Sequence, residues 1–506
     1  MQATHKRLAT DNKKTQQHNN ELIKKVSTMT VDNHNTIQSQ GLYVWQADNL
    51  LTATATLGGR WQMPQAETDT APTLTSNRIT TDTRTIQAGD IFLALSGDNF
   101  DGHDYINIAA SKGAIAAIVS RPISTSMAQL VVEDTRLALG QLGAYRRQQH
   151  PNLTVIAITG SSGKTTCKEM LGSIFGRLAP TLITRGNLNN DLGVPMMLLE
   201  LSDHHRYAVM ELGANHIGEI AYTTELVRPD VACILNIGTA HLGEFGSREG
   251  ICQTKAEIYH TLSDNQFAIV PDKDDFTNQL RRTAEKNTAK VIGFGNTDVS
   301  ASHLDVEPER SEFKLHIGNK VQDICLPLAG EHNVNNALAA AACAYALDID
   351  IEDIVTGLEN ARPAKGRLNS QLLGNHRLID DTYNANPHAV RAAAKVLAAQ
   401  TGTQVMVLGD ISELGDAAVS EHQGLGRTIA ATGIDVLLCV GEYAQYTVAG
   451  AEEIGGISAH AFDDKGSLLQ YLQQYLQAQQ AQPCTVLFKG SRFMEMETLI
   501  NALIEE

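Results

Sequence analysis

The chain has 506 residues, of which 42% are apolar and 19% are charged, a composition typical of a globular protein with about three domains. The net charge of −17 argues against non-specific nucleic-acid binding, because an acidic protein repels a phosphate backbone. The seven cysteines form no Cys-x-x-Cys pair, and the sequence has neither a signal-peptide core nor eighteen consecutive apolar residues, so we expect a cytoplasmic protein that does not span a membrane.

The N-terminal part divides into two segments of different composition. Residues 1–40 are rich in Gln, Asn, Thr, His and Lys, and they are predicted to be a disordered tail. Residues 41–150 are predicted to form a small α/β unit. Its predicted elements are a strand at 91–95, a helix at 109–114 and a strand at 116–119. The polar loops at 80–84 and 96–103 either hold a ligand or cap turns, and the local sequence favours caps.

The most informative motif follows a predicted strand at residues 153–158. The next segment, Thr159 to Thr166, reads Thr-Gly-Ser-Ser-Gly-Lys-Thr-Thr and has the composition of a phosphate-binding loop. Its glycines let backbone N–H groups surround an anion, and Lys164 and the start of a helix near Thr165 add positive charge. The Thr165 hydroxyl is placed to bind Mg²⁺. Ile158 stands where the general pattern has its first glycine, so a chance strand–turn–helix corner is the alternative.

Polar residues also follow the next two predicted strands. Glu211 comes directly after a strand at 207–210, and His241 follows a strand at 231–237. Ligands of parallel α/β sheets collect at the carboxyl ends of strands, where a carboxylate and an imidazole suit a phosphate-bound Mg²⁺. Spacing alone leaves open that both are solvated loop residues. Before them, a long polar loop at 184–195 contains three asparagines.

Three further candidates lie on predicted helices. Lys255 would by default be a solvated surface lysine. Asn333 and Asn336 lie one turn apart at the start of an Ala-rich helix that runs to Leu347. They either share a face toward a base or cap the helix.

A boundary is predicted near Arg362-Pro363, after which strands and helices alternate again. The predicted strands of this last part lie at 377–381, 404–410, 435–441 and 485–491. Several end in glycine, which is typical of a dinucleotide-type parallel sheet. No Gly-x-Gly-x-x-Gly follows a strand here, so a nicotinamide site is not predicted.

From residue 41 onward the chain resembles the Mur ligases, the ATP-dependent amide-forming enzymes of peptidoglycan precursor synthesis. The motifs that carry the resemblance are the phosphate loop without its leading glycine, Asn187 in Gly-Asn-x-Asn-Asn-x-x-Gly-Val-Pro, Glu211, His241, Lys255, Asn333, Asn336 and Lys365-Gly366-Arg367-Leu368. The resemblance implies an α/β protein of three domains. These are a small N-terminal substrate domain at 41–150, a central ATP-binding parallel-sheet domain at 151–362 and a C-terminal Rossmann-like domain at 363–506.

Within the family, the chain is most similar to the branch that adds D-alanyl-D-alanine to UDP-N-acetylmuramoyl-tripeptide. The markers are residues 211–216, 380–387, 408–415 and 489–492. This likeness implies that the tripeptide carboxylate attacks the γ-phosphorus of ATP and forms an acyl phosphate. The dipeptide amine then attacks the carbonyl, and phosphate leaves.

The resemblance also implies roles for single residues. Those expected at ATP are Gly160, Ser161, Ser162, Gly163, Lys164, Thr165 and Thr166 at the phosphates, Asn333 and Asn336 at adenine, Arg367 at the phosphates and Asp381 at the ribose or phosphates. Those expected at two Mg²⁺ ions are Thr165, Glu211, His241 and Lys255, the last as a carbamate. Those expected at the UDP-sugar are Thr83, Arg84, Gly97, Asn187 and Asn190, and at the dipeptide Asn384 and Asn386. The implied catalytic residues are Lys164, Glu211, His241, Lys255 and Arg367.

Two alternative functions stay open at this point. One is another ligase of the same superfamily, either the third-residue muramoyl ligase or a folylpolyglutamate synthetase. The other is a nucleotide-binding switch that hydrolyses ATP slowly and without an amine acceptor. In each case we expect a monomer with no nucleic-acid partner.

Overall fold

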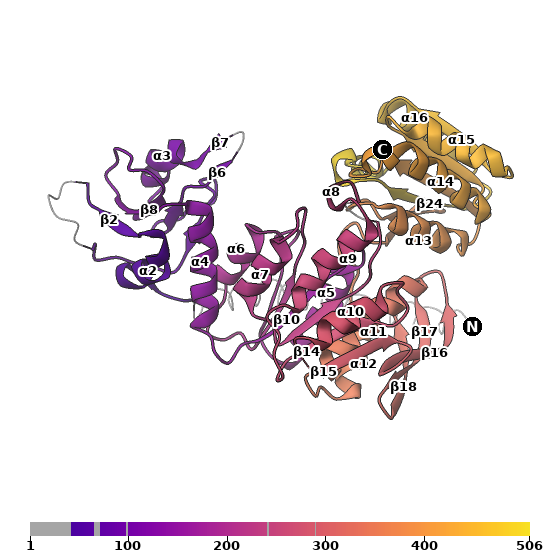
Figure 1. The fold of residues 1–506 in the computed structure, drawn as a ribbon. Helices are drawn as coiled ribbons and strands as arrows, with labels where there is room; N and C mark the ends of the chain where they lie inside the picture. Colours follow the sequence, from indigo (N-terminus) through magenta and orange to yellow (C-terminus); the bar gives the residue numbers. More distant parts are fainter. Residues whose placement is uncertain (1–41, 65–70, 98–99, 240–241, 289, 506) are drawn as a thin grey trace, which may run out of the picture. The chain divides into compact units, whose positions relative to one another are not determined.

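The computed structural model describes residues 42–64, 71–97, 100–239, 242–288 and 290–505. The predicted tail and the candidate His241 lie outside these residues. The chain forms two compact units, one with residues up to Ala138 together with Leu199–His205 and the other with Leu139–Leu198 and Arg206 onward. The three larger sheets, of five, nine and six strands, are each accompanied by helices, which confirms the predicted three-domain α/β class (Figure 1).

The first unit is built on the five-stranded sheet. Its strands, in spatial order, are β2 (Arg60–Gln62), β9 (Ala128–Val131), β8 (Ala116–Val119), β5 (Ile91–Leu93) and β4 (Ile79–Thr80). The predicted helix at 109–114 is α3 (Ile106–Ser111), three residues earlier than expected. A 3-10 turn at Gly102–Tyr105 leads into it, and Gly113 with φ +96° follows its end.

The central sheet has β10 (Thr154–Thr159) among its inner strands. The spatial order is β11 (Thr181–Ile183), β12 (Tyr207–Glu211), β10, β13 (Val231–Ile234), β14 (Phe267–Pro271), β15 (Lys290–Gly295), β16 (Val299–Val306), β17 (Ser311–Ile317) and β18 (Lys320–Leu326). The first seven strands, up to β16, run parallel, as predicted for this domain. The last two break this pattern, because β17 pairs antiparallel with β16 and β18 pairs antiparallel with β17. The sequence reading missed this antiparallel pairing. Buried and partly exposed residues alternate along β17, as expected for a strand with one covered face.

The central core lies between this sheet and three helices. They are α5 (Lys164–Leu178), α11 (Glu331–Tyr345) and α12 (Ile351–Glu359), and α5 packs against both others. Fully buried alanines on α11 let the backbones approach closely. Cys167, Cys233 and Cys343 are buried free thiols in this core.

The C-terminal sheet has the predicted Rossmann-like character. Its order is β19 (Asn369–Leu373), β20 (His376–Asp380), β24 (Cys484–Lys489), β21 (Thr403–Gly409), β22 (Val436–Val440) and β23 (Ser458–Phe462), and only the edge strand β19 is antiparallel. Its helices include α13 (Pro387–Ala398), α14 (Ala418–Ala431), α15 (Ala444–Ile454), α16 (Lys465–Ala478) and α17 (Glu497–Ile504). The parallel strands bring the loops after β20, β21 and β24 to one edge.

The helices of the described residues are too short or too polar to span a membrane, because none of them combines the length and the apolar character that crossing a bilayer requires.

Candidate functional site

The predicted phosphate loop connects β10 to α5. Gly163 has φ +82°, a left-handed conformation that glycine adopts without strain, and α5 begins at Lys164, one residue before the predicted start. A Cβ at Gly163 would come within 2.2 Å of the Asn336 side-chain oxygen, so a larger residue does not fit. The first N–H groups of a helix have no partner within it, which suits this helix start to an anion.

The Lys164 side chain folds back on its own loop. Its Nζ donates to the carbonyl of Gly160 at 2.8 Å. Burial lowers the pKa of Lys164, and the carboxylate of Glu211 opposes that shift. A phosphate bound to the loop would add another opposite charge and favour the ammonium form.

Two asparagines hold the middle of the loop from outside. Asn236 lies two residues past β13, accepts from the Ser162 N–H at 3.0 Å and donates to the Ser162 carbonyl at 3.0 Å. Asn386, in the C-terminal domain, donates to the Ser161 carbonyl at 3.1 Å. The sequence reading missed Asn236, whose one local signal is its position just after a strand.

The predicted metal ligands Thr165 and Glu211 come together in the structure. Thr165 Oγ1 lies 3.4 Å from Glu211 Oε2, and Asn189 Nδ2 donates to Glu211 Oε1 at 2.8 Å. Both are buried, which excludes the reading of Glu211 as a solvated loop residue. Within the described ranges, which leave out His241, no three His, Cys, Asp or Glu side chains form a ready metal cluster. A hydroxyl and a carboxylate nevertheless fit Mg²⁺, which takes oxygen ligands and few protein donors.

Lys255 is buried in the last turn of α9 (Arg248–Ala256), so the default reading of a solvated lysine is wrong. Burial, and then the neighbouring Lys164 ammonium, lower the pKa of Lys255 to about 7. The neutral amine is the form that can react with CO₂. The surroundings of Lys255 therefore fit a carbamate, whose negative charge would offset that of Lys164.

Asn333 and Asn336 lie on one face at the start of α11. Asn333 Nδ2 donates to the Ala329 carbonyl at 2.7 Å, and Asn336 Nδ2 donates to Asn333 Oδ1 at 3.3 Å. Gly330 is the N-cap residue of α11 and no side chain caps it, so the capping alternative is wrong for both asparagines. Both are buried polar residues next to the loop.

A cavity of about 900 Å³ brings these residues together with the C-terminal domain. The predicted site residues that line it are Ser161, Ser162, Gly163, Lys164, Thr165, Thr166, Asn187, Asn190, Glu211, Lys255, Asn333, Asn336, Arg367, Asp381, Asn384 and Asn386. Gly160 does not line the cavity but anchors Lys164.

Arg367 and Asp381 occupy the side of the cavity that belongs to the C-terminal domain. The Arg367 guanidinium lies over the Tyr383 ring, 4.7 Å from its centroid, and its buried Nε has no hydrogen-bond partner among the residues that the structure describes. Asp381 Oδ2 accepts from Lys489 Nζ at 2.6 Å, in a pair buried on both sides. Burial lowers the pKa of Lys489, while Asp381 favours its charged form.

Replacing Lys489 by Met tests this buried pair. We expect Lys489→Met to lower the free energy of unfolding by about 3–5 kcal/mol, because it leaves the Asp381 carboxylate buried without its counter-charge. Urea unfolding followed by circular dichroism measures the change. Lys489→Met combined with Asp381→Asn removes both charges and should recover part of the loss. A single variant as stable as the parent would contradict the role of the pair.

Two asparagines predicted to bind the substrates, Asn190 and Asn384, accept hydrogen bonds from backbone N–H groups of the protein itself. Asn190 Oδ1 accepts from the Gly193 N–H at 2.8 Å, at the start of α6 (Gly193–Leu199). Asn384 is exposed, and its Oδ1 accepts from the N–H groups of Ala385 at 2.8 Å and Arg492 at 3.3 Å.

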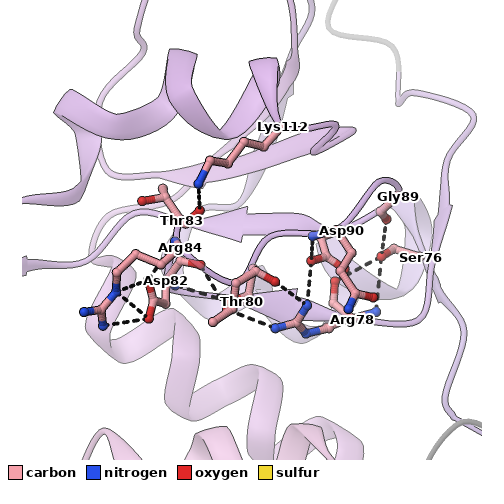
Figure 2. Close-up of polar contacts among 11 residues, drawn as sticks. Ser76, Arg78, Thr80, Asp82, Thr83, Arg84, Gly89, Asp90 and Lys112 are labelled. Carbon is pink, nitrogen blue, oxygen red and sulfur yellow. Dashed lines mark hydrogen bonds and ion pairs between the residues drawn. The ribbon is translucent and has the colours of Figure 1, made fainter.

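Thr83 and Arg84, two of the three candidates of the first unit, lie on a polar loop (Figure 2). Asp82 accepts from the Arg84 N–H at 2.9 Å and pairs with its guanidinium at 2.8 Å, so Asp82 stabilises a turn, as the capping reading predicts. The Thr83 carbonyl accepts from Lys112 Nζ at 2.8 Å. Arg84 is exposed, and Gly97 lies exposed on β6 (Ser96–Gly97). The exposed Arg84 guanidinium is therefore held in place by Asp82, two residues before it.

Comparison with known families gives three matches along the chain. A model described as the Mur ligase family, catalytic domain, matches residues 75–147. The Mur ligase middle domain matches residues 158–344, and the Mur ligase, glutamate ligase domain, matches residues 366–492. Each match falls on one of the three larger sheets, in chain order.

Individual relatives are similar over most of their length. UDP-N-acetylmuramoyl-tripeptide--D-alanyl-D-alanine ligase of Escherichia coli (strain K12) is 42% identical over 85% of this chain and 94% of the relative. A crystal structure of MurF from Acinetobacter baumannii is 53% identical, with a TM-score of 0.87 over 92% of this chain and 100% of that chain. MurF ligase from Thermotoga maritima in complex with ADP is 27% identical, with a TM-score of 0.73 over 85% and 97% of the two chains.

Proposed function

The chain belongs to the Mur ligase family, and we propose that it joins D-alanyl-D-alanine to the peptide carboxylate of UDP-N-acetylmuramoyl-tripeptide, converting ATP to ADP and phosphate. The similarity to ligases that carry this activity in their names supports the substrate pair. The observation that carries the proposal is the single cavity in which a phosphate loop, a buried lysine and the C-terminal loops meet.

The reaction begins with an electrostatic problem. A carboxylate must approach the γ-phosphoryl group of ATP, and both carry negative charge. Lys164, from the loop, and Arg367, from the C-terminal domain, bring two cations to this cavity. The unpartnered Nε of Arg367 is an N–H donor available to a phosphate oxygen.

Mg²⁺ fits the oxygen donors Thr165 and Glu211, and it would neutralise charge on the phosphates when bound. Asn189 restrains the Glu211 carboxylate by donating to Oε1, and the other oxygen, Oε2, lies next to the Thr165 hydroxyl. We propose that carbamylated Lys255 and His241 complete the set for two ions, and that Asn333 and Asn336 bind adenine beside the loop.

The second half of the reaction needs protection from water. The acyl phosphate would hydrolyse in an open site, and a cavity walled by two domains limits that loss. The dipeptide amine then attacks the activated carbonyl, and phosphate leaves as the amide forms. We place the dipeptide near Asn384 in the C-terminal loops, and the UDP-sugar at Thr83, Arg84, Gly97, Asn187 and Asn190. Asp381 is proposed to lie near the ribose.

One assay tests the proposal against its alternatives. Purified protein is given ATP, Mg²⁺ and UDP-N-acetylmuramoyl-tripeptide, and ADP release is measured with and without D-alanyl-D-alanine. We expect rapid release only with the dipeptide, together with the pentapeptide product. Release that depends on a single amino acid instead would indicate another ligase of the superfamily, and release without any acceptor would indicate a nucleotide switch. Either result would overturn the proposal.

A further inference from the structure

The peptide units at Ser161 and Ser162 set the shape of the phosphate loop. A loop that binds phosphate through backbone N–H groups must hold its peptide planes in fixed orientations. Asn236 bonds to the plane before Ser162 through the N–H of that residue, and to the plane after it through the carbonyl. The Ser161 hydroxyl accepts from the Gly238 N–H at 2.9 Å. These bonds all lie within the central domain.

The Ser161 carbonyl is bonded differently, because its donor comes from another domain. Asn386 Nδ2 donates to it at 3.1 Å. Asn386 Oδ1 accepts from the Ala389 N–H at 2.8 Å and thereby caps α13. With the oxygen committed to the helix cap, the NH₂ group is oriented toward the loop. His388, the second residue of the same helix, lies with Nδ1 3.4 Å from Ser162 Oγ.

We propose that Asn386 is a positioning residue that couples the C-terminal domain to the phosphate loop. When the start of α13 lies against the loop, its amide holds the Ser161 carbonyl and favours the conformation that binds nucleotide phosphates. By linkage, bound nucleotide favours the docked C-terminal domain to the same degree. This deepens the proposed function, on which it rests for the identity of the ligand, and it assigns Asn386 to the loop instead of the dipeptide.

The proposed role of Asn386 predicts which affinities and KM values change when its hydrogen bond to Ser161 is lost. The loss of one hydrogen bond should weaken ADP binding by about 3- to 10-fold, in the absence of any dipeptide. The KM for ATP should rise by a similar factor, and the KM for D-alanyl-D-alanine should stay unchanged. A residue that contacts the dipeptide would give the opposite pattern.

Asn386→Ser separates the two halves of the amide. Serine is a good N-cap residue, so the α13 cap is kept, but its short hydroxyl does not reach the Ser161 carbonyl as an amide does. Asp464→Ser is the matched control, because Asp464 caps α16 by accepting from the Ser467 N–H at 2.9 Å and lies outside the cavity lining. Calorimetric titration of the full chain with ADP compares the parent, Asn386→Ser and Asp464→Ser. If Asn386→Ser does not fold, Asn386→Asp keeps the cap and also lacks the donor.

The reciprocal effect is measured by proteolysis. Lys365 is exposed between the central and C-terminal sheets and offers trypsin a cleavage site. ADP should slow cleavage there in the parent and in Asp464→Ser, and less so in Asn386→Ser. Unchanged ADP affinity and unchanged protection in a folded Asn386 variant would overturn the inference. A parent protein that binds ADP but does not ligate would overturn the proposed function alone, since the comparison of ADP affinities does not require ligation.

Discussion

Lys164→Ala is expected to abolish ATP-dependent ligation, with a loss in kcat/KM of at least about 10³-fold. Lys164 is the only lysine of the loop motif and starts the helix that follows it. Its ammonium supplies charge where the phosphates must be approached by a carboxylate. Removal of that charge raises the barrier of the first step more than it weakens nucleotide binding, because the charge on the phosphates is redistributed as the phosphoryl group is transferred.

The measurement is ADP release with all substrates present, and the fold is checked by thermal unfolding. In the described part of the chain, Lys164 donates to the Gly160 carbonyl of its own loop, so the unfolding midpoint should change little. Lys290→Ala is a suitable control, because Lys290 is an exposed lysine of the same domain that lies over the Phe267 ring. Parent-like turnover in Lys164→Ala would refute the assignment of the loop.

Lys255→Ala should be severely impaired and should regain part of its activity with short carboxylic acids such as acetate or formate. Lys255 is buried beside Lys164, and a small acid can enter the space of the missing side chain and supply the negative charge of the carbamate. Ligation is measured across a range of acid concentrations. Lys290→Ala should show neither the defect nor the rescue. Full activity of Lys255→Ala without any acid would refute the carbamate.

The pKa of Lys255 also gives the direction of a pH effect. With a pKa of about 7, lowered from 10.5, the amine is neutral above pH 7 and protonated below it. Only the neutral amine takes up CO₂, so ligation should fall as the pH drops through 7, and added bicarbonate should restore it most near that pH.

The lowered pKa of Lys255 also has a consequence for stability. The unfolded chain binds the proton more tightly between pH 7 and 10, so the contribution of this group to the free energy of unfolding rises with pH over that window.

The phosphate loop could be predicted because its signals are local. The glycines, Lys164 and Thr165 are adjacent in sequence, and each is required by backbone geometry or charge at that point. The parallel strands were predictable for a similar reason, since continuous apolar runs mark strands covered on both faces. The boundaries differ from the predicted ones by three residues for α3 and by one for the start of α5, because turns and helix starts compete at those points.

The supporting side chains could not be predicted from such signals. Asn236 lies 74 residues from Ser162 in sequence, and Lys489 lies 108 residues from Asp381. Pairs of this kind exist only when two strand ends meet at one edge of a sheet, and nothing in the local pattern of either residue identifies its partner. The burial of Lys255 is a tertiary effect too, because a lone lysine on a helix is ordinarily solvated.

The segment Leu199–His205 has a consequence for dissecting the molecule into parts. It begins at the last residue of α6 but groups with the first unit, where Ser202 pairs with Leu42 in an antiparallel bridge and Leu201 is fully buried. The first unit is therefore discontinuous in sequence. A recombinant fragment that stops at residue 138 or 150 would lack Leu199–His205, which is part of the interior of this unit. To study the unit in isolation, these seven residues should be attached to the fragment through a flexible linker.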